Sequence, residues 1–104
     1  MVMIFQVQEP RDQLLKEGIV CTFRKKQHKE GKDWATDKRC GKKIADITIE
    51  KLFVVECPED LRNYADQSGF KSTVEWWVRI QQKYGKDPLP GYLYKVTRLG
   101  ARAQ

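Results

Sequence analysis

The segment at residues 44–55 constrains the fold more than any other part of the chain. Its first half alternates apolar and polar residues, a pattern typical of a strand with one buried and one solvated face. From Leu52 to Val55 every residue is apolar, which indicates that the strand then enters the core. The change of phase near Lys51 indicates a bulge or a bend, a feature by which small barrels close. We therefore expect a curved sheet.

Other local signals predict three more strands and three helices. The strands are expected at residues 4–7, 19–24 and 92–99, and the helices at residues 10–17, 58–67 and 73–84. Pro10 and Gly18 bracket the first helix, and Ser72 with Glu75 forms a capping box for the third. The order β-α-β-β-α-α-β in 104 residues predicts one mixed α+β domain over residues 1–104. We expect a small, partly closed β-barrel with helices packed at its side, followed by a tail at residues 100–104.

The third helix carries two adjacent tryptophans. Neighbouring residues on a helix point about 100° apart, so Trp76 and Trp77 cannot both face the core. Helical spacing predicts a buried stripe of Val74, Trp77, Val78 and Tyr84, with Ile80 at its edge. Trp76 then falls on another side of the helix, together with Arg79 and Lys83.

Positive charge is concentrated in residues 24–43. This segment holds nine Lys or Arg against three acidic residues, an excess that equals the net charge of +6 of the whole chain. A localised field of this kind suits a polyanion, because each neutralised phosphate releases condensed counterions. His28 and Trp34 lie within the run, and rings among cations suit stacking on unpaired bases. The weak hydrophobic periodicity predicts a long loop or irregular hairpin, and a simple solubilising loop is the alternative interpretation.

Two candidate contacts lie outside the loop itself. Thr22 and Arg24 are two residues apart on the predicted strand at residues 19–24, so both point to the same face, which we expect to look outward. Arg offers a planar fork for phosphate or a base edge, and Thr offers a hydroxyl. Ser68 lies between the second and third helices, beside the amides of a helix start. Ordinary strand and cap roles account for the same residues.

Metal, cofactor and membrane chemistry find little support in the sequence. Cys21, Cys40 and Cys57 are widely spaced and odd in number, which is typical of reduced thiols in a cytosol and not of a disulfide framework or a zinc site. No phosphate-binding glycine loop or metalloprotease motif occurs. No apolar run is long enough for a membrane span, and the N-terminus does not resemble a secretion signal. We expect a cytoplasmic protein that does not bind membranes and has no cofactor and no metal.

Several of these segments together resemble the ASCH domain, a branch of the PUA-like superfamily. The segments that carry the resemblance are Leu15-Lys-Glu-Gly18 with Cys21-Thr-Phe-Arg24, Gly41 to Ile49, Ser68-Gly-Phe70 with Glu75-Trp76, and Leu93-Tyr-Lys-Val96. The resemblance implies a small PUA-like β-barrel whose cleft binds RNA or a modified nucleobase. It also implies, for some members, an amidohydrolase site of Lys, Thr and Glu. Only Thr22 matches that set, because Ile19 stands in place of the Lys and Ser68 is nearest to the Glu.

These observations predict a nucleic-acid-binding module whose partner is RNA. The expected contacts are Thr22, Arg24, Lys25, Lys26, Trp34, Lys42, Lys43 and Ser68. The alternative is an enzyme on RNA or modified nucleosides, ribonuclease or amidohydrolase-like, with a diverged site, and the sequence leaves open whether the protein is an enzyme. A third interpretation is an interaction protein whose basic loop meets an acidic partner.

Overall fold

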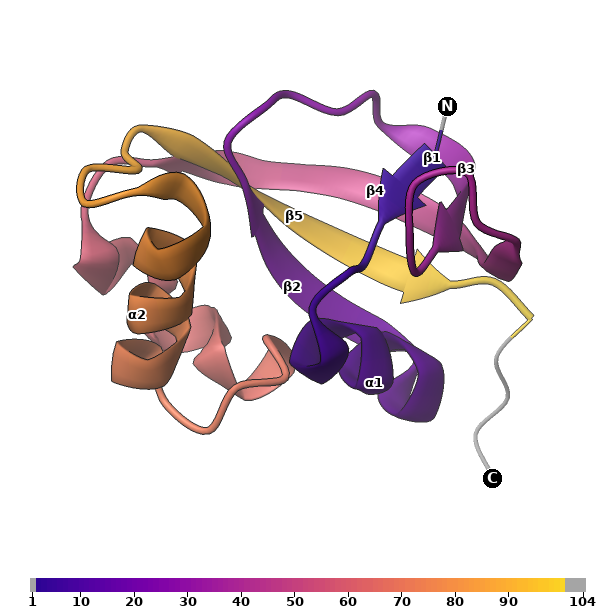
Figure 1. Cartoon of the computed structure of the whole chain (residues 1–104), viewed down its shortest axis with the longest axis horizontal. Helices are drawn as coiled ribbons and strands as arrows, with labels where there is room; N and C mark the ends of the chain where they lie inside the picture. The colour runs from indigo at the N-terminus through magenta and orange to yellow at the C-terminus, as the bar shows by residue number, and fades with distance from the viewer. Residues whose placement is uncertain (1, 101–104) are drawn as a thin grey trace.

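The computed structural model describes residues 2–100, and its centre is a five-stranded sheet that curls into a half-barrel (Figure 1). The elements in chain order are β1 (Val2–Ile4), α1 (Gln8–Glu17), β2 (Ile19–Arg24), β3 (Gly31–Thr36), β4 (Lys43–Val55), the 3₁₀ helix η1 (Pro58–Gln67), α2 (Thr73–Tyr84) and β5 (Gly91–Arg98). The strand order is β1-β3-β4-β5-β2, with β1 parallel to β3 and all other neighbours antiparallel. The mixed α+β fold, a curled sheet with helices beside it, is as predicted. Of the expected tail, residues 101–104 lie outside the described residues.

The predicted bend in the strand at residues 44–55 is present in β4. Its pairing with β5 shifts register between Lys51, which faces Tyr94, and Phe53, which faces Leu93. Leu52 is therefore the extra residue of a bulge. The bulge divides β4 between two buried clusters: Ile47 and Ile49 pack with α1, and Val55 packs with η1 and α2.

The predicted element order lacks one strand, because the basic segment contains β3. β3 hydrogen-bonds to β4 on one side and to β1 on the other, so the segment is half of a hairpin and part of the sheet. Only Ala35 and Thr36 of its six residues are buried. A strand with so few buried positions leaves no clear apolar alternation, which is why the sequence pattern failed to indicate it.

The predicted buried stripe of α2 is wrong for Val74 and Val78, whereas Trp77 and Tyr84 are partly buried and pack against the core. Trp76 is 2% exposed and Ile80 5% exposed, whereas Val74 is 73% exposed and Val78 43% exposed. The buried face of α2 includes Trp76 and Ile80, and the long cations at positions 79 and 83 flank them. The spacing of apolar residues predicts that a helix face with cations is exposed to solvent. Here two cations flank the buried face, because long cationic side chains can lie along apolar surface.

The turns that frame the helices follow the local signals closely. Gly18 ends α1 in the left-handed conformation, with φ of 79°, and its amide donates to the Leu14 carbonyl at 3.0 Å. The Ser72 hydroxyl accepts a hydrogen bond from the Glu75 amide at 3.1 Å at the start of α2. Gly69 also has a positive φ, of 91°, and a side chain there would collide with the backbone of Glu9. The connection between η1 and α2 is therefore pressed against the start of α1.

Candidate functional site

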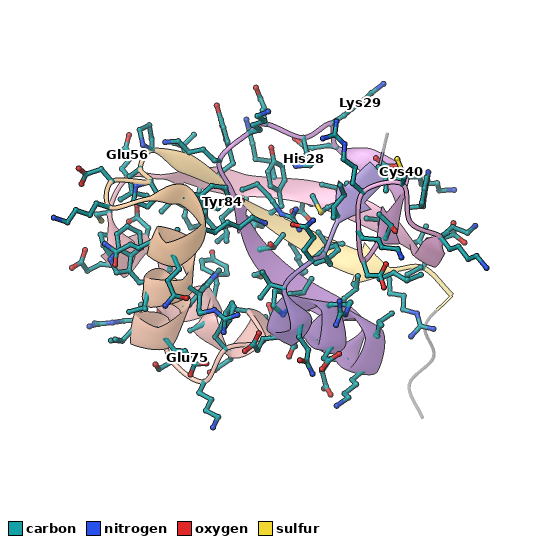
Figure 2. The ribbon with its side chains drawn as sticks, viewed as in Figure 1. His28, Lys29, Cys40, Glu56, Glu75 and Tyr84 are labelled. Carbon is teal, nitrogen blue, oxygen red and sulfur yellow. The ribbon has the colours of Figure 1, made fainter. Side chains whose placement is uncertain are left out.

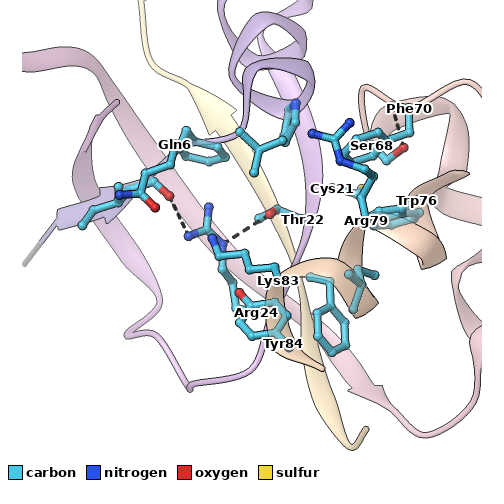
Figure 3. Close-up of a pocket in the computed structure, with 16 residues that line it drawn as sticks. Gln6, Cys21, Thr22, Arg24, Ser68, Phe70, Trp76, Arg79, Lys83 and Tyr84 are labelled. Atoms are coloured by element: carbon cyan, nitrogen blue, oxygen red, sulfur yellow. Dashed lines mark hydrogen bonds between the residues drawn. The ribbon is translucent and has the colours of Figure 1, made fainter. Parts of the chain in front are cut away.

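Arg24 connects the two opposite edges of the half-barrel. It is the last residue of β2, one edge of the sheet, and its Nη1 donates to the carbonyl of Ile4 in β1, the other edge, at 2.7 Å (Figure 3). Its Nε donates to Thr22 Oγ1 at 3.3 Å. The guanidinium also lies over the Phe5 ring, with Cζ 4.8 Å from the ring centre. The seam between β1 and β2 is thus bridged by a side chain.

Thr22 and Arg24 do not face outward as predicted. Thr22 is 6% exposed and Arg24 9% exposed. The face of β2 that carries Thr22 and Arg24 is predicted to be solvated. In the structure the connection between β1 and α1 and the end of α2 cover it. A period of two shows that two residues share a face, but it does not show whether that face is open.

A pocket lies between β2, the segment after β1 and the buried side of α2, and we call it the cleft (Figure 3). Its walls combine aromatic rings with cations. The aromatic residues that line it are Phe5, Phe23, Phe70, Trp76 and Tyr84, and the cations are Arg24, Arg79 and Lys83. Thr22 and Ser68 line it as well, so three of the predicted contacts meet at one cavity. No Asp, Glu or His is among the described residues that line it.

The cations of the cleft differ in how their charge is balanced. Arg79 pairs with Glu9 of α1, at 2.8 Å from Nη1 to Oε2, and this hydrogen bond lowers the pKa of the Glu9 carboxyl. Within residues 2–100, the partners of Arg24 are all neutral, namely a carbonyl, a hydroxyl and an aromatic ring. Burial lowers the pKa of its guanidinium from the ordinary value to about 10, so it remains charged at neutral pH.

Lys83 adds a second positive charge on the same side of the cleft. Partial burial lowers the pKa of its ammonium group, and the charge of Arg24 lowers it further. Its ammonium lies 5.5 Å from the centre of the Tyr84 ring, and among the described residues no carboxylate pairs with it. Two repelling cations beside a partly buried cavity favour an anion between them.

Ser68 lies at the other end of the cleft from Arg24, near Phe70 and Trp76 (Figure 3). It is 1% exposed, and its hydroxyl donates to the Ala65 carbonyl at 2.6 Å and accepts from the Phe70 amide at 3.1 Å. These bonds order the turn between η1 and α2. Ser68 therefore shapes the wall that Phe70 forms.

Two of the predicted lysines line a second, adjoining cavity. Lys25 and Lys26 form its walls together with Arg24, His28 and Tyr84, and we call this cavity the basic hollow. Lys25 Nζ donates to the carbonyls of Pro88 at 2.7 Å and Pro90 at 2.9 Å, so it also holds the loop before β5.

The structure does not bring Trp34, Lys42 and Lys43 into either cavity. Trp34 lies in β3 opposite Asp46, is 36% exposed, and alternates with the buried Ala35, so it points away from the core. Lys43 pairs with Asp46 at 3.0 Å. β3 places residues 31–36 of the basic segment in the sheet. The two predicted lysines before β3 therefore line the basic hollow, and the two after it do not.

The sequence reasoning missed Phe5, Arg79, Lys83 and Tyr84 as residues of the cleft. A signal for three of them was available in α2. Trp76, Arg79, Lys83 and Tyr84 recur at spacings of three, four and one, which places an aromatic and cationic stripe on one side of the helix. Such a stripe suits a helix that faces a polar ligand.

Other kinds of site are not formed by the described residues. Within residues 2–100, no group of three or more His, Cys, Asp or Glu side chains is arranged to hold a metal ion. Cys21, Cys40 and Cys57 are all free thiols. In the same range no helix has the length and apolar character needed to cross a membrane. Comparison of the chain with protein-family models, with curated proteins and with solved structures gives no match.

Proposed function

We propose that the protein is an RNA-binding module of the PUA-like type, related to the ASCH domain, which holds a nucleotide of single-stranded RNA in the cleft. The observation that carries the proposal is Arg24, a buried and charged guanidinium in the wall of an aromatic cavity, with no carboxylate partner among the described residues. A curled sheet with helices at its side supports the PUA-like assignment.

The phosphate of the nucleotide would lie between Arg24 and Lys83. In the described part of the chain, Arg24 donates two of its five N–H groups to protein acceptors, so donors remain for a phosphate oxygen. An anion there removes the repulsion between the two cations and compensates the cost of burying Arg24. Inorganic phosphate and nucleotide phosphates share this chemistry.

The base would lie against the aromatic walls. Tyr84 is next to Arg24 and Lys83 in the cleft, and Phe70 lines its other end; both rings are partly exposed (Figure 3). Stacking of a base on an aromatic side chain contributes about 1–3 kcal/mol and tolerates any base. An unpaired nucleotide therefore satisfies both the charge and the apolar surface of the cleft.

Binding fits the cleft better than hydrolysis. General-base catalysis needs a group that accepts a proton near neutral pH, and the described residues that line the cleft include no carboxylate and no imidazole. Burial raises the pKa of the Cys21 thiol, which donates to Gln67 Oε1 at 3.4 Å, so this thiol is a poor nucleophile. Product analysis after incubation with RNA tests the enzyme alternative.

Lys83→Ala provides the test of the site, with Lys86→Ala as its matched control. Both lysines are exposed and near the end of α2, but only Lys83 lines the cleft. We expect Lys83→Ala to weaken binding of a short single-stranded RNA about three- to tenfold at low salt and to reduce the salt slope by about one phosphate. Lys86→Ala should change the affinity less than twofold. Equal effects of the two variants in a fluorescence anisotropy titration would show a diffuse cationic surface, and no binding at low salt would remove the proposal.

A further inference from the structure

The basic hollow adjoins the cleft and shares two residues with it. Arg24 and Tyr84 line both cavities, so they form the wall between them. The remaining walls of the hollow are Lys25, Lys26 and His28, all from the segment that follows β2. No acidic residue is among the described residues of this wall. A second cationic surface therefore begins where the cleft ends.

The loop that carries His28 is held in place by a core residue. The backbone amide of His28 donates to the hydroxyl of Tyr94 at 2.6 Å, and this hydroxyl also donates to the His28 carbonyl at 3.3 Å. The imidazole packs edge-on against the Tyr94 ring, with 5.6 Å between ring centres. Tyr94 is fully buried in β5, so the loop that lines the hollow is anchored to the central sheet.

The charges of the hollow are also available to a ligand. Lys26 is exposed, and no ion pair holds it within residues 2–100. Two charged residues shift the pKa of His28 from the strands that precede and follow its loop. Arg24 is in β2 and Asp33 is in β3. Burial lowers the pKa of the His28 imidazole, the charge of Arg24 lowers it further, and Asp33 opposes this. At pH 8 the ring is therefore a neutral hydrogen-bonding group.

We propose that the basic hollow is a second phosphate subsite, so that the protein binds two consecutive nucleotides with Arg24 and Tyr84 between them. This inference rests on the proposed function, because it assigns the first nucleotide to the cleft. Lys26 and His28 contact the second phosphate, and Lys25 holds the wall through its bonds to the loop before β5. The minimal ligand is then a phosphorylated dinucleotide.

The test compares two probes, uridine 5′-monophosphate and the dinucleotide pUpU, at pH 8 and low salt. The variants are Lys26→Ala and His28→Ala, and the control is Lys29→Ala, which removes the same charge as Lys26→Ala from the same loop. Lys29 extends away from the body of the protein in Figure 2 and lines neither cavity. Circular dichroism verifies that each variant is folded.

We expect wild-type protein to bind pUpU at least about fivefold more tightly than the monophosphate, because the second phosphate adds a contact. Lys26→Ala and His28→Ala should reduce this preference to less than twofold, and Lys29→Ala should retain it. The loss in His28→Ala is informative because no charge is removed at pH 8.

Three other outcomes would contradict the second subsite or the proposed function. If the monophosphate binds and pUpU binds no better, the second subsite is refuted and the cleft stands. If all three variants reduce the preference for pUpU equally, the preference comes from the overall positive charge of the loop, and the hollow is not a subsite. If neither probe binds, the proposed function fails together with the inference.

Discussion

Replacement of Arg24 by Met separates a ligand-binding role from a structural one. Burial of the charged guanidinium lowers its pKa from the ordinary value to about 10, which corresponds to roughly 3 kcal/mol of unfavourable desolvation at neutral pH. Met has a similar length and no charge, so the substitution removes this cost. It also removes two hydrogen bonds, one of them long, and bonds from charged donors contribute about 1.5–3 kcal/mol each. The opposing contributions are of similar size.

We therefore expect Arg24→Met to unfold in urea within about 2 kcal/mol of the wild-type free energy. RNA affinity should fall at least tenfold, because the central cation of the site is lost. A saturating RNA at 100 times its dissociation constant should add about 2.7 kcal/mol to the stability of the wild type and much less to that of the variant. The paired urea titrations, with and without RNA, measure both quantities on the same samples.

Two results would refute this reasoning. A destabilisation above about 4 kcal/mol would mean that Arg24 is chiefly a clasp between β1 and β2, and that its burial needs no ligand. A well-folded variant that binds RNA as tightly as the wild type would exclude Arg24 from the site.

Two further predictions concern the framework of the cleft. Trp76→Ala should lower the free energy of unfolding by about 3–5 kcal/mol, whereas Val74→Ala, at a position 73% exposed, should change it by less than about 0.5 kcal/mol, as measured by chemical denaturation. The pKa of Glu9 is lower in the folded protein because Arg79 bonds to it, so the stability from this pair is present above the unfolded pKa and is lost as the pH falls through the folded pKa. Denaturation midpoints between pH 6 and pH 3 should therefore decrease less steeply in Glu9→Gln than in the wild type, and parallel profiles would contradict the assignment.

Local signals predicted most of the elements, because turns and caps are encoded by neighbouring residues. Gly18, the Ser72 cap and the phase change near Lys51 each describe their own backbone, and each is found where the sequence indicated it. β3 was missed because its stability comes from hydrogen bonds to β1 and β4, which are distant in sequence. Strand pairing of this kind leaves no local trace when the strand buries few side chains.

The site was partly predictable for the same reason. Strand spacing predicts Thr22 and Arg24 as contacts, and the position between two helices predicts Ser68. All three residues line the cleft. The basic run predicts Trp34 as a contact because Trp34 is close in sequence to the lysines. In the structure β3 places Trp34 in the sheet, where it lines neither cavity. Helical spacing places Lys83 on the same side of α2 as Trp76 and Arg79, but spacing alone does not show that this side faces a cavity.

The contact that joins the two edges of the half-barrel has an evolutionary consequence. Arg24 bonds to a main-chain oxygen, and every amino acid supplies that oxygen at position 4. Selection on the contact therefore constrains only one of the two positions, and paired substitutions between them are not expected. Methods that infer proximity from correlated changes in related sequences would not detect the contact that joins the two edges of the half-barrel. An invariant arginine at the end of a strand, with no matching acidic position elsewhere, would be its only trace.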